Sequence, residues 1–200
     1  MQKPSIIVKD LVVKTQDTVV FDGISFSLRS TEHLAILGNS GSGKTALAKA
    51  LAGKIHWNGK ILIDSNDEKN PRVELVEQRY SFKNLCGISE FYYQQRFNSF
   101  DSEDAPTVYE ELEKASSKDS KQGNNIDNTL VILGIEQLKN SPLIQLSSGE
   151  HKRFQLAKAL VNPPQVLLLD TPYTGLDVAS VHKLNKILDA ISKKGTLIIL

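Results

Sequence analysis

The chain has 200 residues, of which 24 are Lys or Arg and 23 are Asp or Glu, so its formal net charge is +1. Hydrophobic residues make up 40% and charged residues 24%, as in a globular protein that buries a substantial core. The balanced charge disfavours a nucleic-acid-coating surface and an anchor for anionic membranes. The single cysteine, Cys86, cannot form an internal disulfide, so we expect a cytoplasmic protein.

The apolar runs of the sequence are short, as in Val166 to Leu169, whereas a membrane span needs roughly 20 apolar residues. Residues 1–10 contain no long apolar stretch of the kind found in signal peptides. The sequence stops at Leu200 within a predicted buried strand, which favours a truncated chain or a piece of a longer one.

The first third of the chain contains short β-forming runs and one helix. Turn signals at residues 22–23 and 30–32 separate some of these runs. A helix is predicted from Lys44 to Ala52, with Gly53 as its stop. From β-branched and aromatic residues we predict strands at residues 6–8, 11–13, 18–21, 24–28, 34–37 and 61–63.

The rest of the chain passes from a polar stretch to an α/β pattern. Residues 116–125 have the composition of a solvated loop, and residues 166–169 that of a central parallel strand. The order of strand, helix and strand at the end predicts a right-handed crossover in a parallel sheet. Helices are predicted at residues 108–115, 128–133, 152–160 and 178–194, with a strand at 196–200. The apolar stripe of the last helix consists of Val178, Val181, Leu184, Leu188 and Ile191.

A glycine-rich loop carries the clearest chemical signal of the sequence. Glycines let backbone N–H groups turn toward phosphate oxygens, and a following helix points its positive end at them. A lysine suits the β- and γ-phosphates, and a threonine hydroxyl suits Mg²⁺. We therefore expect a P-loop that binds a nucleoside triphosphate with Mg²⁺. Its residues are Gly38, Asn39, Ser40, Gly41, Ser42, Gly43, Lys44 and Thr45.

Two further parts of the sequence could act together with this loop. Asp170 directly follows the apolar run 166–169; such an Asp usually caps a helix, but together with a P-loop it is expected to hold Mg²⁺. Ser147, Gly149 and a helix N-terminus are suited to a second anion-binding tip. The local sequence alone favours a capping box, with Ser147 as N-cap and Glu150 three residues later.

Four motifs of this sequence resemble those of an ABC-type ATPase domain in their order and spacing. They are the glycine loop, Leu146-Ser147-Ser148-Gly149-Glu150, the run ending in Asp170, and Thr174-Gly175-Leu176-Asp177. LSSGE is similar to the family's LSGGQ signature, and TGLD is similar to its D-loop. The resemblance covers nearly the whole chain and implies ATP and Mg²⁺ as ligands. It also implies a head-to-tail pair of domains, in which Ser147, Ser148, Gly149 and Glu150 act in trans on the partner's nucleotide.

The family also has a Q-loop glutamine, which contacts the metal and the attacking water. The run Tyr92-Tyr93-Gln94-Gln95-Arg96 fits its expected place between the P-loop and a helical subdomain. Either glutamine suits this role, and Gln95 is favoured.

Three features depart from the family pattern. Thr171 stands where a catalytic Glu is usual, and because a hydroxyl cannot act as a general base as a carboxylate does, we expect slow hydrolysis. Thr15 stands where an aromatic residue stacks on adenine, which predicts weaker binding and weaker base discrimination. The family's switch histidine would follow residues 196–200, beyond the end of the sequence. We interpret His151 and His182 as surface histidines.

The predicted fold is α/β, with a P-loop NTPase core, a mostly parallel sheet, an N-terminal antiparallel β portion and a helical subdomain. Residues 1–89 hold the first part of the core, residues 90–160 the helical subdomain with the Q-loop and signature, and residues 161–200 the rest of the core. The leading function is an ABC-type ATPase domain that couples MgATP binding and slow hydrolysis to head-to-tail dimerisation and serves a transporter.

The expected partners are a second ABC domain, in a homodimer or later in the same chain, and a transmembrane permease at the inner face of the cell membrane. The run Gly175 to Ser180 and the variant signature also resemble tandem ABC ATPases associated with molybdate transport. One alternative is a regulatory module that holds ATP without hydrolysing it, which Thr171 favours. Another is a soluble ABC protein acting on DNA or ribosomes, which the near-neutral charge does not support.

Overall fold

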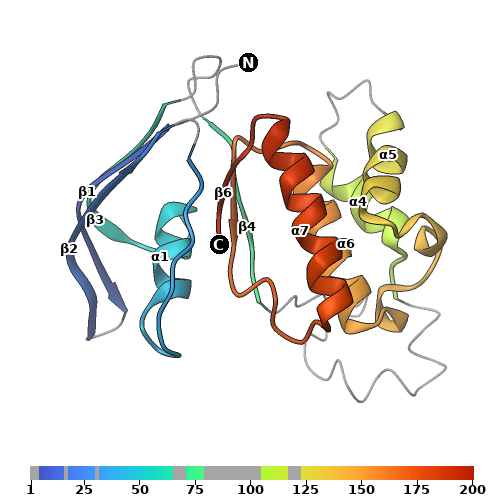
Figure 1. The fold of residues 1–200 in the computed structure, drawn as a ribbon, viewed down its shortest axis with the longest axis horizontal. Coiled ribbons are helices and arrows are strands. Elements are labelled where there is room, and N and C mark those ends of the chain that lie inside the picture. The colour runs from blue at the N-terminus through green and yellow to red at the C-terminus, as the bar shows by residue number, and fades with distance from the viewer. Residues whose placement is uncertain (1–4, 16–17, 30–31, 65–70, 79–104, 117–122) are drawn as a thin grey trace. The chain divides into compact units, whose positions relative to one another are not determined.

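The fold is α/β, as predicted, and the chain divides into two compact units (Figure 1). The first unit comprises Met1–Gln78, Pro163–Pro172 and Leu188–Leu200, and the second comprises Arg79–Asn162 and Tyr173–Ile187. A computed structural model describes residues 5–15, 18–29, 32–64, 71–78, 105–116 and 123–200.

An antiparallel sheet in the first unit has the strand order β2–β1–β3. Its strands are β1 (Ser5–Thr15), β2 (Thr18–Leu28) and β3 (Trp57–Asp64). The antiparallel N-terminal portion is thus confirmed, but the predicted short runs merge into two long strands. The turn predicted at Asp22-Gly23 is wrong, because Gly23 lies inside β2 with φ 86°, where the β1–β2 register shifts. An irregularity of this kind absorbs a glycine without reversing the chain.

A parallel sheet in the same unit has the order β4–β5–β6, with strands at Val73–Val76, Val166–Leu169 and Leu197–Ile199. Strand β4 was not predicted, because its four residues follow a polar stretch and include Glu74. The strand predicted at residues 34–37 is wrong as a regular strand. Leu34 forms only an isolated parallel bridge with Ile199, although Ile36 N also donates to Leu200 O at 2.9 Å.

Helix α1 (Lys44–Leu51) lies between these two sheets, contacting β1 and β4 (Figure 1). It ends at Gly53, as predicted, where φ is 67°. Its inner face supplies Leu47, Ala50 and Leu51 to a core shared with both sheets. The sheets contribute buried aliphatic residues, among them Ile6, Val8, Leu11, Val13, Val166, Leu168 and Leu197. This packing fixes the start of α1, and with it the glycine-rich loop.

The described part of the second unit is built from helices. Its elements are α4 (Val108–Ala115), α5 (Gly123–Leu133), the short helices η1 (Glu136–Leu138) and η2 (Leu143–Gln145), and α6 (Ser148–Leu160). Helices α4, α5 and α6 contact one another and bury aliphatic residues and Phe154. The predicted loop at residues 116–125 extends too far, since α5 already begins at Gly123.

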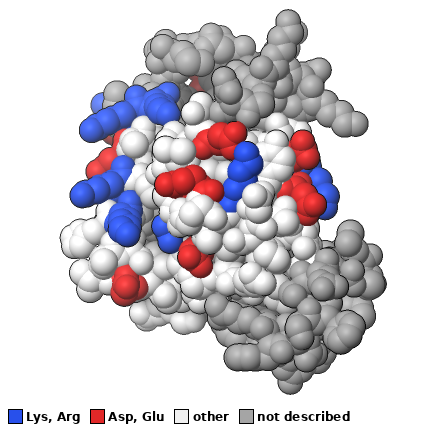
Figure 2. Space-filling view, turned by 90° about the vertical axis from the view of Figure 1, so that its right-hand side faces the viewer, with Lys and Arg blue, Asp and Glu red and all other residues white. Residues whose placement is uncertain are grey.

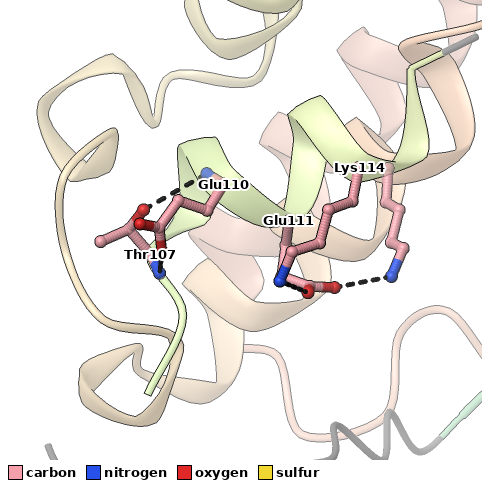
Figure 3. Close-up of polar contacts among 5 residues, drawn as sticks. Thr107, Glu110, Glu111 and Lys114 are labelled. Carbon is pink, nitrogen blue, oxygen red and sulfur yellow. Dashed lines mark hydrogen bonds and ion pairs between the residues drawn. The ribbon is translucent and has the colours of Figure 1, made fainter. Parts of the chain in front are cut away.

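Polar contacts hold α4 in place within this unit (Figure 3). Thr107 begins the helix with a capping box: its hydroxyl accepts from Glu110 N at 3.2 Å, and Thr107 N donates to Glu110 Oε2 at 2.9 Å. Glu111 accepts from Lys114 at 3.2 Å and from Lys158 of α6 at 3.0 Å. Burial alone would raise the pKa of Glu111, but the two lysines outweigh it and lower that pKa. The carboxylate therefore links α4 to α6.

Helix α7 (Val178–Lys193) follows β5 and leads through Gly195 into β6. Strands β5 and β6 are parallel neighbours, as predicted. The predicted apolar stripe is only partly right: Val178 is 75% exposed, because it is the first helical residue and precedes the buried turns. The buried stripe consists of Leu184, Ile187, Leu188 and Ile191. Among the described ranges, no helix has both the length and the apolar character needed to cross a membrane.

Candidate nucleotide-binding site

The glycine-rich loop leads directly into α1 and is exposed from Gly38 to Ser42. Gly41 and Gly43 have φ 82° and 91°, a backbone region that other residues rarely adopt. Gly43 is the N-cap of α1 and makes no side-chain cap, and the first turn of this helix holds no acidic residue. The first N–H groups of α1 thus lie at the positive end of the helix beside no acidic side chain of its first turn, an arrangement that suits an anion.

The Lys44 ammonium closes the loop on itself. Its Nζ donates to the carbonyl oxygens of Gly38 at 2.7 Å and Asn39 at 2.8 Å, and lies 3.4 Å from Ser42 Oγ. Carbonyl oxygens are weaker partners for an ammonium than charged oxygens are. A phosphate that enters the loop can therefore replace these carbonyl oxygens as the partner of Lys44. Contact with the phosphates is the role predicted for this residue.

Thr45 and Asp170 meet, although they are 125 residues apart in the chain: Thr45 Oγ1 donates to Asp170 Oδ2 at 2.7 Å. Asp170 is 7% exposed, and its backbone N–H donates to Val76 O of β4 at 3.0 Å. Hydroxyl and carboxylate oxygens suit Mg²⁺, which takes few protein ligands and completes its shell with water and phosphate. The described residues contain no cluster of three or more His, Cys, Asp or Glu that would hold a metal alone.

Thr171 has φ 49° and is one of two non-glycine residues at positive φ in the described ranges. This conformation is strained for a β-branched residue. Its hydroxyl oxygen is buried and, among the residues that the structure describes, makes no hydrogen bond. The side chain after Asp170 is thus a buried hydroxyl on a strained backbone, and a hydroxyl cannot accept a proton from water as a carboxylate does.

Ser147 begins α6 with the capping box that its sequence favoured. Ser147 Oγ donates to Glu150 Oε2 at 2.7 Å, Ser147 N donates to the same oxygen at 2.8 Å, and Glu150 N donates back to Ser147 Oγ at 3.4 Å. The helix-capping interpretation is confirmed. The in-trans role of these residues stays a prediction.

The signature and the D-loop are neighbours in the second unit. A methyl group built on Gly149 would lie 3.9 Å from both Leu176 Cδ2 and Ser180 Oγ. Asp177 Oδ1 accepts from Ser180 N at 2.7 Å, and the hydrogen bonds from Ser180 lower the pKa of the Asp177 carboxyl. Asp177 therefore stays ionised at the start of α7.

The prediction that His151 is a surface residue is wrong. Its side chain follows the signature on α6, is 8% exposed, and lies edge-on to the Phe154 ring with centroids 5.9 Å apart. Burial, with a smaller contribution from the Lys152 charge, lowers the pKa of His151 from 6.5 to about 4. Its position in the first turns of α6 gave no sign of this burial, which tertiary packing imposes. His182, by contrast, is exposed as predicted.

The buried His151 is expected to make folding acid-sensitive. The unfolded chain takes up a proton near pH 6.5, whereas the folded imidazole resists protonation until about pH 4. The contribution of the neutral imidazole to the free energy of unfolding is therefore fully present above pH 6.5. It is lost as the pH falls toward 4, and the total loss is about 3 kcal/mol. Denaturant unfolding at pH 7 and 4.5 should show a smaller pH dependence in His151→Gln. The exposed control His182→Gln should show the same pH dependence as the wild type. An equal change in the free energy of unfolding between the two pH values in all three chains would contradict the expectation.

Some predicted site residues cannot be placed. Gln94 and Gln95, the two candidates for the Q-loop, lie outside the described residues. Thr15 ends β1, but its side chain is likewise outside what the structure describes. These assignments stay predictions.

Comparison with known proteins agrees with the geometry. Residues 21–174 match the ABC transporter family. The energy-coupling factor transporter ATP-binding protein EcfA of Methanocaldococcus jannaschii is 32% identical over 199 residues, covering 96% of this chain and 67% of that protein. An uncharacterized ABC transporter ATP-binding protein of Schizosaccharomyces pombe is 29% identical over 181 residues, covering 86% of this chain but only 36% of the relative.

A solved structure gives the same answer. The structure of cbiO1 from Clostridium perfringens, part of the ABC transporter complex cbiONQ, has a TM-score of 0.71 and 29% identity, over 97% of this chain and 76% of that chain. The family match spans most of the sequence and includes the P-loop, the signature and Asp170. The chain therefore belongs to the ABC transporter family, as an ATP-binding domain.

Proposed function

We propose that this domain holds MgATP with Lys44 at the phosphates and with Thr45 and Asp170 at the metal. The observation that carries the proposal is the 2.7 Å contact between Thr45 Oγ1 and Asp170 Oδ2. It joins two separate motifs at the open N-terminus of α1, where hydroxyl, carboxylate and helix N–H groups match the donor set that a magnesium–phosphate complex needs. Bound Mg²⁺ would supply charge neutralisation and orientation of the phosphates.

We further propose that hydrolysis is slow. Family membership supports ATPase activity, but the position after Asp170 holds the strained hydroxyl of Thr171. Loss of a general base typically costs ~10²- to 10⁴-fold in rate. The same observation favours a second function, in which the domain holds ATP as a regulatory module and its partner domain performs the chemistry.

The proposed partners are a second ABC domain and a transmembrane permease at the cytoplasmic face of the membrane. EcfA and cbiO1 are named as ATP-binding or complex-forming parts of transporters. In this arrangement Ser147 and Gly149 would contact the nucleotide of the opposite domain, and Gln95 would contact the metal. An action on nucleic acid has no support from the net charge of +1, and one face of the molecule shows acidic and basic side chains intermixed (Figure 2).

Magnesium dependence tests the metal site. ATP affinity of the wild type is expected to rise with Mg²⁺, and Thr45→Val should lose most of this gain, roughly tenfold, because a methyl group cannot ligate the ion. The matched control Thr45→Ser keeps the hydroxyl and should keep the gain. Isothermal titration with ATP, in Mg²⁺ and in EDTA, measures both. A wild type that ignores Mg²⁺, or a Thr45→Val chain that still responds fully, would overturn the assignment.

A further inference from the structure

A bulge in β2 turns two consecutive side chains to one side of the sheet. In the β1–β2 pairing, Val13 lies opposite Phe21 and Lys14 lies opposite Val19, so Val20 is an extra residue. Consecutive residues of a regular strand point to opposite faces, but a bulge re-aims them. Both Val20 and Phe21 are half-buried and pack against the core of the first unit.

These two side chains lie against the last glycine of the P-loop. A methyl group built on Gly43 would lie 2.6 Å from Val20 Cγ1, and 2.7 Å and 3.1 Å from Cζ and Cε2 of Phe21. The edge of the aromatic ring therefore borders the N-cap of α1, where the phosphates are proposed to bind. The Phe21 side chain is only half-buried, so part of its surface is exposed.

We propose that the Phe21 ring is the surface on which the sugar and base of the bound nucleotide pack. The inference rests on the proposed phosphate site, because a nucleotide held there extends its sugar and base away from the loop. Thr15 offers no aromatic surface, so Phe21 supplies the planar contact from a different position. Since every base has a π-face, stacking of this kind tolerates adenine and guanine alike.

The rest of the sheet keeps the ring in place. Val13 is fully buried, and it pairs with Phe21 on one side and Trp57 on the other. Residues opposite one another in neighbouring strands share a face, so the three side chains form a row across β2, β1 and β3. Phe21 is the member of this row that reaches Gly43.

The test compares three ligands in Mg²⁺: ATP, GTP and inorganic tripolyphosphate, which has phosphates but no base. Phe21→Leu should weaken ATP and GTP by roughly 5- to 20-fold, the lower part of the range for loss of base stacking, and leave tripolyphosphate unchanged. The matched control Phe26→Leu changes another half-buried phenylalanine of β2 and should leave all three affinities unchanged. Phe21→Trp should bind ATP and GTP more tightly than Phe21→Leu does. The fluorescence of the introduced indole should respond to ATP but not to tripolyphosphate.

Two other results would contradict the proposed contact of Phe21 with the sugar and base. Equal losses for ATP and tripolyphosphate would show that Phe21 only shapes the P-loop, and unchanged ATP affinity in Phe21→Leu would show that the base packs elsewhere. The proposed function fails by a different result, namely ATP binding by the wild type that is insensitive to Mg²⁺ and to Thr45→Val. Unfolding curves of both leucine variants establish that each chain is folded.

Discussion

Replacing Thr171 by glutamate is expected to raise the ATP turnover of the paired domain by roughly 10²- to 10⁴-fold. Glutamate at this position would provide a carboxylate directly after Asp170. The backbone of Asp170 is held by its hydrogen bond to Val76 of β4. The substitution also removes a β-branched side chain from φ 49°, where such side chains are disfavoured. Phosphate release, measured at a protein concentration that saturates dimerisation, checks the expectation.

Two controls separate base chemistry from relief of strain. Thr171→Gln has the length of glutamate without its basicity, and should bind ATP without accelerating hydrolysis. Thr171→Asn places a residue that tolerates positive φ, and should stabilise the fold by about 1 kcal/mol without changing turnover. A Gln variant as active as the Glu variant would refute a missing base, and an inactive Glu variant that still binds ATP would show that hydrolysis is limited by another group.

Removing the Lys44 ammonium is expected to lower MgATP affinity by about 10²- to 10⁴-fold. Hydrogen bonds between charged groups contribute about 1.5–3 kcal/mol each, and Lys44 is proposed to make two of them with phosphates. In the structure the same ammonium donates to the Gly38 and Asn39 carbonyls, so Lys44→Ala also loosens the loop. Equilibrium titration with MgATP measures the loss.

Lys49→Ala is the matched control, since it changes another lysine of α1 that pairs with Glu77 at 3.6 Å, away from the loop. Its MgATP affinity should equal that of the wild type. A Lys44→Ala chain that binds as tightly as Lys49→Ala would show that the loop holds no phosphate.

The parts of the fold that sequence predicted are those with strong local signals. The P-loop, helix α1 with its glycine stop, and the apolar strand β5 are each specified by neighbouring residues. The contact between Thr45 and Asp170 agrees with the prediction that both residues hold the same Mg²⁺ ion, a role that itself stays a prediction.

The features that sequence missed depend on distant packing. Gly23 reads as a turn residue, but only pairing with β1 shows that it belongs to a bulge. His151 is polar and lies three residues after the exposed Ser148, yet Phe154 and the surrounding helices bury it. The contact of Phe21 with Gly43 likewise requires the bulge and the position of α1, neither of which has a local signature.

The capping box of α6 places a carboxylate of the same chain against the first residue of the helix end that carries the signature. The Glu150 carboxylate already receives the Ser147 hydroxyl and backbone N–H, at the helix end where a partner's γ-phosphate would arrive. The LSGGQ pattern has an uncharged glutamine at this position, whereas the carboxylate repels a phosphate. If the signature acts in trans as proposed, closing two domains over ATP would require the Glu150 carboxylate to move away from Ser147, and α6 would lose a cap contributing about 1 kcal/mol.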